Sequence, residues 1–118
     1  MYDYFPNNYN WSLALYSVSS MGLPLSFIGR VAAQLREFSD PADQRAPERW
    51  YQTWMALGSK FEDAGHEDRN ENRHMSAGAK YRRASVCYLM ANRMMSHHDA
   101  RQIQSYNKGL EAFAAHLE

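Results

Sequence analysis

Large apolar side chains recur at alternating steps of four and three residues through the middle of the sequence. This period keeps one face of an α-helix apolar, whereas a half-buried strand would alternate every second residue. Over residues 47–64 it predicts a long helix that opens at Pro47, a residue suited to the first helical turn. The apolar stripe of this helix is Trp50, Trp54, Leu57, Phe61 and Ala64.

A second stripe of the same period follows a polar segment. Residues 65–72 predict a bend, and the next helix is expected from Arg73 to about Met95. Its apolar face is widened in the second half by Val86, Leu89, Met90 and Met94, so we expect contacts on more than one side of it. The two helices should form a long hairpin that packs like a tetratricopeptide repeat, without a second copy of that unit of about 34 residues. The stripe is Ala77, Tyr81, Ala84, Tyr88, Ala91 and Met95.

Turn-forming residues divide the rest of the chain. Residues 1–10 are predicted as an ordered aromatic arm, residues 11–39 as two helices separated at Gly22 and Pro24, and residues 40–46 as a linker. Residues 47–118 hold three further helices, the last of which follows a Ser96–Asp99 segment similar to a capping box. The prediction is a single all-α domain, residues 1–118, with about five mostly antiparallel helices and no strand. The aromatic rings of the arm are expected to be packed rather than left in water: Tyr2, Tyr4, Phe5 and Tyr9. The large apolar residues of the last helix are expected to share one face: Ile103, Tyr106, Leu110, Phe113 and Leu117.

The composition narrows the class of protein. The 118 residues are 45% hydrophobic, and 13 basic side chains balance 13 acidic ones. A neutral chain has no electrostatic reason to bind nucleic acid or an anionic membrane, and no apolar run approaches the length of a membrane span. A single cysteine, Cys87, fits a reducing compartment, and no basic leader precedes the arm. We therefore expect a cytoplasmic protein that binds neither membrane nor nucleic acid.

The motifs of common catalytic chemistries are missing from the sequence. It contains no G-x-S-x-G nucleophile elbow, no glycine-rich phosphate loop and no H-E-x-x-H metal motif. His97-His98-Asp99 is better explained as a helix cap, and His66, Asp68 and His74 as a solvated cluster in the polar bend. We predict no catalytic residue, no metal and no cofactor. Cys87 is expected to be a buried structural thiol.

Aromatic side chains with polar tips are the best candidates for ligand contact. Such residues near the start of a helix can bind an aromatic ligand, or they can hold the arm against the bundle. Both explanations stay open. The candidates for lining a substrate are Tyr9, Trp11, Tyr16 and Tyr88.

Three segments together resemble one family. They are the opening Tyr4-Phe5-Pro6-x-Asn8-Tyr9-x-Trp11, the pair Trp50 and Trp54, and the run Ser76-Ala77-Gly78-x-Lys80-Tyr81-Arg82-Arg83-Ala84-Ser85 with Tyr88-Leu89 beyond it. They are similar to the N-terminal helical lid of FrsA-like (DUF1100-type) α/β-hydrolases, a group that includes 2,6-dihydroxypseudooxynicotine hydrolase and polyketide-shortening pigment hydrolases. Residues of the family motif expected to be structural are Trp50, Trp54, Tyr81, Arg83 and Ser85.

The resemblance implies a function that this chain does not carry out alone. In the family the lid covers a domain that cleaves C–C or ester bonds of aromatic ketones or polyketides with a Ser-His-Asp triad. The implied partners are such a catalytic domain, on the same or a separate chain, and a small aromatic or polyketide-like ligand; a homodimer is left open. Gly22-Leu23-Pro24 departs from the family, whose members tend to have Gly-Gly and acidic residues here. Two alternatives are a free-standing lid homologue that binds or cyclises a small aromatic molecule and a tetratricopeptide-like protein-interaction module.

Overall fold

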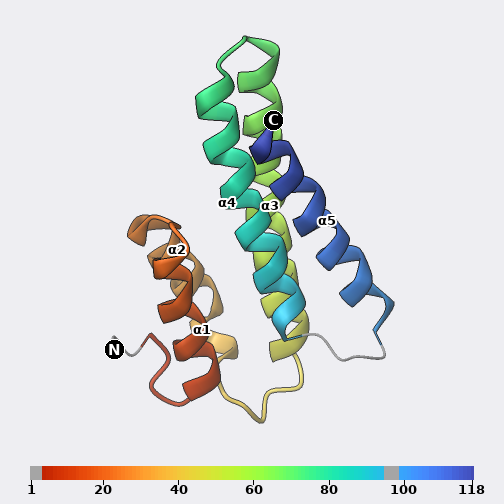
Figure 1. Cartoon of the computed structure of the whole chain (residues 1–118). Helices are drawn as coiled ribbons and strands as arrows, with labels where there is room; N and C mark the ends of the chain where they lie inside the picture. The colour runs from red at the N-terminus through yellow and green to blue at the C-terminus, as the bar shows by residue number, and fades with distance from the viewer. Residues whose placement is uncertain (1–3, 95–98) are drawn as a thin grey trace.

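The chain forms a helical bundle in which a long hairpin is flanked on two sides (Figure 1). The computed structural model describes residues 4–94 and 99–118, and in these it contains five α-helices, one short 3-10 turn and no strand. This confirms the predicted all-α class. The helices α3 and α4 form the hairpin, α5 packs on α4, and α1 and α2 cover the other side near the hairpin base. The bounds are α1 Tyr9–Ser20, α2 Leu25–Leu35, η1 Arg36–Phe38, α3 Ala46–Asn70, α4 His74–Arg93 and α5 Ala100–Leu117.

The aromatic arm is shorter than predicted. Helix α1 begins at Tyr9, because the side chain of Asn8 accepts a hydrogen bond from the Trp11 backbone N–H and caps the helix. Phe5 is fully buried, and the Ser12 hydroxyl bonds to both its backbone N–H and its carbonyl oxygen. Tyr9 is 68% exposed, so the expectation that the whole arm turns its rings inward was wrong for this residue. Tyr2 lies outside the described residues.

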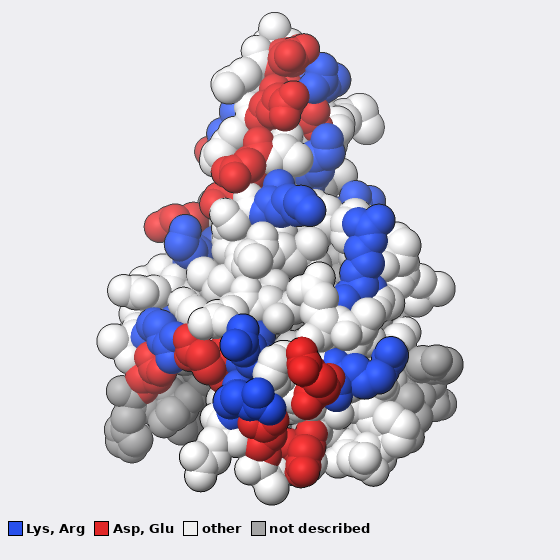
Figure 2. All heavy atoms as spheres, turned by 180° about the vertical axis from the view of Figure 1, so that it is seen from behind, with Lys and Arg blue, Asp and Glu red and all other residues white. Residues whose placement is uncertain are grey.

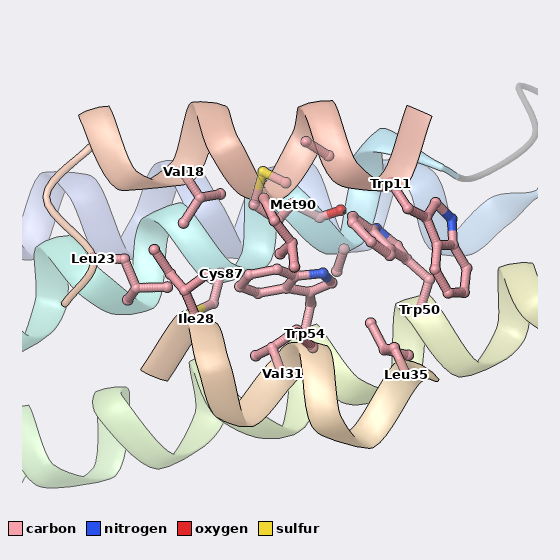
Figure 3. Close-up of a cluster of buried hydrophobic side chains, with 14 of the residues drawn as sticks. Trp11, Val18, Leu23, Ile28, Val31, Leu35, Trp50, Trp54, Cys87 and Met90 are labelled. Carbon is pink, nitrogen blue, oxygen red and sulfur yellow. Dashed lines mark hydrogen bonds between the residues drawn. The ribbon is translucent and has the colours of Figure 1, made fainter. Parts of the chain in front are cut away.

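Helices α1 to α4 supply most of one apolar core, to which α5 adds Ala112, and the core is centred on the two tryptophans of α3 (Figure 3). Trp50 and Trp54 are fully buried, with ring centroids 5.7 Å apart, and Trp11 of α1 lies 5.0 Å from Trp50. The Trp50 indole N–H donates to the carbonyl oxygen of Met90, whereas that of Trp54 has no acceptor among the described residues. Large rings supply much apolar area per residue, so few of them stabilise a small domain.

Two glycines of α3 let α4 approach closely. A Cβ atom on Gly58 would lie 2.7 Å from the Tyr88 ring, and one on Gly65 would lie 2.9 Å from the Tyr81 ring. Helix α3 therefore continues past Gly65 to Asn70. The predicted polar bend at residues 65–72 was wrong over most of its length, because the glycine packs against a tyrosine and does not end the helix. The long hairpin is observed; its likeness to tetratricopeptide packing stays a prediction.

A buried carboxylate joins the two helices beside their turn. Asp68 is 3% exposed and accepts hydrogen bonds from Arg73, Ser76 and Lys80, the last at 2.5 Å. These bonds, first those of Lys80 and Ser76, hold the pKa of Asp68 well below its usual range. The expected solvated cluster of His66, Asp68 and His74 was therefore wrong for Asp68. A signal was present, because Asp68 continues the α3 stripe from Phe61 by steps of four and three.

Candidate functional site

Helix α5 packs on α4 through its small side chains. Ser105, Gly109 and Ala112 are its buried residues, and a Cβ atom on Gly109 would lie 2.9 Å from a methyl group of Leu89. The Ser85 hydroxyl of α4 donates to the Gly109 carbonyl oxygen at 2.9 Å. Because small residues occupy the contact, the two helix backbones come close together. The larger residues of α5 are consequently left on its other side.

Polar contacts fix both ends of α5. At its start, the Asp99 side chain accepts from the Arg101 backbone N–H, and the Arg101 guanidinium also binds Glu48 of α3. At its end, the His116 ring donates from Nδ1 to the Gly78 carbonyl oxygen at 2.8 Å. The predicted cap residues Ser96, His97 and His98 lie outside the described residues, and Asp99 is the N-cap. These contacts set the orientation of α5 about its own axis.

The outer face of α5 is apolar, and the described residues leave it largely exposed. Its five large side chains share one face, as the spacing predicts, but each is between 47% and 70% exposed. Side chains of this size leave on the order of 500 Å² of apolar surface in water, at the upper end of what monomers expose. We call this surface the α5 outer face; it consists of Ile103, Tyr106, Leu110, Phe113 and Leu117.

On the face seen from behind, charged side chains lie mainly toward the two ends of the molecule (Figure 2). Acidic and basic groups gather together on the protruding end of the hairpin and again near the opposite end. Between them the centre of this face is uncharged, with basic side chains at its edge (Figure 2). Several are paired: Arg73 with Asp68 and Glu71 near the hairpin turn, and Arg101 with Asp99 and Glu48 at the other end. On the side shown, the two signs are interspersed.

The structure does not bring the four candidate substrate-lining residues together. Tyr9 and Tyr16 are exposed, seven residues apart on the outer side of α1. Trp11 belongs to the core, beside Phe5 and Trp50. Tyr88 is 1% exposed and donates its hydroxyl to Glu62. Burial, and then this carboxylate, raises the Tyr88 pKa.

The residues of the family motif lie in and around the α3–α4–α5 contacts. Trp50 and Trp54 form the core centre, and the Tyr81 hydroxyl lies 2.6 Å from Nδ1 of His66. The Arg83 guanidinium lies over the Phe61 ring, and Ser85 bonds to α5. Each therefore has a packing partner in this chain.

Cys87, the single cysteine, lies in an environment that disfavours the thiolate form a nucleophile needs. It is fully buried among apolar residues, and this burial raises its pKa, which keeps the thiol protonated. Residues 4–94 and 99–118 contain no group of three or more His, Cys, Asp and Glu side chains placed to hold a metal ion. His97 and His98 fall outside these ranges.

The helices of the described chain are too short or too polar to cross a membrane. The α5 outer face is therefore an apolar surface on a helix that is not itself a membrane span. Comparisons with protein-family models, curated proteins and solved structures found no match for this chain.

Proposed function

We propose that this chain is a helical lid of an α/β-hydrolase. It packs through the α5 outer face on a catalytic domain, on the same or a separate chain, and encloses the substrate from one side. The catalytic domain would supply the Ser-His-Asp triad and break C–C or ester bonds of aromatic ketone or polyketide-like substrates. A lid excludes water and shapes specificity without itself breaking bonds.

The α5 outer face is the observation that carries this proposal. Five large apolar side chains lie in a row on a helix whose other side is already packed and bonded to α4. A contiguous patch of this size marks a surface that associates with another one. We infer the occupant from the resemblance of the Ser76–Ser85 motif, and of Trp50 and Trp54, to the hydrolase lid.

The exposed tyrosines of α1 are a separate candidate ligand surface, because α1 and α5 flank opposite sides of the hairpin. Tyr9 and Tyr16 present rings with a polar tip on a surface that the described residues do not cover. Such rings suit contact with aromatic ligands.

We propose that the protein works in the cytoplasm. Cys87, a buried reduced thiol, is compatible with that compartment.

Purification of the native protein tests the proposal. Antibodies raised against residues 1–118 would recover it from its source, and mass spectrometry would identify every polypeptide recovered. We expect a hydrolase domain with a G-x-S-x-G elbow, either in the same polypeptide or in a tightly bound one. Recovery of this sequence with no hydrolase domain in the same polypeptide or bound to it would contradict the proposal. Bound peptides of other kinds would favour a protein-interaction module.

A double variant tests the surface itself. Ile103→Gln with Leu117→Gln should reduce retention of a separate hydrolase at least tenfold, or open a protease-sensitive site between lid and catalytic domain if both share one chain. Leu25→Gln is the matched control, because Leu25 and Leu117 are both 70% exposed. Equal behaviour of the two variants would show that α5 does not form the contact.

A further inference from the structure

A second surface feature lies where the α1–α2 turn meets α4. Helix α1 ends at Ser20, and Gly22 adopts a φ of 92°, a conformation that favours glycine. This turn places Met21 and Leu23 opposite one face of α4. In Figure 1 this is the side of the hairpin on which α1 and α2 lie. Between the turn and α4 is a cleft of about 320 Å³, and His116 of α5 also lines it. The cleft is therefore built from three separate segments of the fold.

Apolar side chains line the cleft from two segments, among polar groups that also face it. Met21 and Leu23 line it from the turn, and Met75 and Val86 line it from α4. Its volume is at the lower end of the range of small-molecule sites, which is roughly 300–1,000 Å³. A compact ligand of one or two rings fits this size better than a peptide does.

The charged groups of the cleft all belong to basic residues. Arg82 and Arg83 line it, and no Asp or Glu is among the described residues that do. Neither arginine forms an ion pair with a described carboxylate, whereas Arg45, Arg73 and Arg101 each have one at 2.8 to 2.9 Å. The guanidinium carbon of Arg82 would lie 3.9 Å from a Cβ atom placed on Gly22, so this cation is directed at the turn.

We propose that this cleft binds a small organic anion, a carboxylate carried on an aromatic or similarly apolar body. The Arg82 guanidinium would hold the carboxylate through charge-assisted hydrogen bonds. The methionines Met21 and Met75 would contact the apolar body, since their flexible side chains adapt to irregular shapes. The absence of a side chain on Gly22 leaves room for the ligand at the turn. This inference goes beyond the proposed lid function, because it concerns a ligand bound by this chain alone.

The test uses 1-naphthoate as the probe on the full 118-residue chain. Titration at low salt, followed through the methionine methyl signals by NMR, should give saturable binding that shifts Met21 and Met75. The neutral analogue 1-naphthamide, which has the same rings, should bind at least tenfold more weakly. Added salt should weaken naphthoate binding and leave naphthamide unchanged.

Two variants separate the site from general charge effects. Arg82→Gln should weaken naphthoate binding about tenfold or more, with an unchanged circular dichroism spectrum. Arg36→Gln, which removes one positive charge from the 3-10 turn, should leave the affinity for naphthoate unchanged. Equal affinity for the two naphthalene probes, equal loss in both variants, or no saturable binding in the millimolar range would overturn the proposal. Because no hydrolase is present, the result does not depend on the lid proposal.

Discussion

The core under α1 and α2 and the contact of α5 with α4 use opposite kinds of side chain. In the core, Trp11, Trp50 and Trp54 turn their rings inward against one another. On α5, Ser105, Gly109 and Ala112 turn inward, and the large side chains face solvent. The arrangement in the core stabilises the fold by burying apolar surface. The arrangement on α5 brings α5 close to α4 and leaves an apolar surface for another molecule. Removing large side chains should therefore have different consequences in the two regions.

Trp50→Ala should have the largest effect on stability. It removes a fully buried ring and the hydrogen bond to the Met90 carbonyl oxygen, so we expect the free energy of unfolding to fall by about 3–5 kcal/mol. Urea denaturation followed by circular dichroism measures the change. A loss below about 1 kcal/mol would mean that the core is not the main source of stability.

Asp68→Asn should destabilise the hairpin in a pH-dependent way. The native pKa of Asp68 is lowered by Lys80, Ser76 and Arg73, so the native state favours the charged form. Its stabilisation is fully present above the ordinary carboxyl pKa of about 4 and is lost as the pH falls below it. We expect the variant to melt several degrees lower at pH 7 and the difference to shrink in acid.

Thermal melts of parent and variant between pH 2 and 7 check this expectation. Asp63→Asn, an exposed position on the same helix, is the control and should leave the melting temperature nearly unchanged at every pH. A constant difference between Asp68→Asn and the parent across the series would show that the charge of Asp68 does not matter.

The same glycine substitution should be costly in one region and mild in the other. At Gly58 the new methyl group would meet the Tyr88 ring and the Cys87 Cβ atom, so Gly58→Ala should cost about 1–3 kcal/mol. At Gly109 the new methyl group would meet the end of the Leu89 side chain, which is 39% exposed and free to rotate away. Alanine also favours the helix by roughly 1 kcal/mol, so Gly109→Ala should stay within about 1 kcal/mol of the parent. Parallel urea titrations would reveal equal losses if the two helix contacts were alike.

Leu117→Gln should have the smallest effect on the isolated chain. The side chain is 70% exposed, so the free energy of unfolding should change by no more than about 0.5 kcal/mol. The same urea titration measures it. A loss of 2 kcal/mol or more would place the α5 outer face inside the folded core of this chain and end its role as a docking surface.

Hydrophobic periodicity predicted where the helices form better than it predicted what packs against each helix face. The stripe from Trp50 to Phe61 identified a buried face, and Gly22 and Pro24 correctly separated α1 from α2. The same rule placed Ile103 and its partners on one face but could not say what covers that face. The inner face of α5 is signalled by small residues at steps of four and three, a pattern that apolar periodicity overlooks.

The chemistry of single residues was harder to predict than the fold. Asp68 has the appearance of a solvated residue in a polar segment, and only the continuation of α3 past Gly65 turns it toward α4. The cleft at Gly22 depends on three segments distant in the sequence, so no local pattern indicates it. Arg82 and Arg83 are adjacent basic residues in the sequence, but only the structure shows that neither pairs with a carboxylate of the described residues.

Hydroxyl-radical footprinting tests the central claim, that the α5 outer face is covered by a catalytic domain. Tyr106 and Phe113, each about half exposed, should react readily in the isolated chain. In the native protein their reactivity should fall severalfold, while Met75, which is 92% exposed, should react equally in both as an internal control. Equal reactivity of Tyr106 and Phe113 in the two samples would contradict the account, because no partner would then lie on α5.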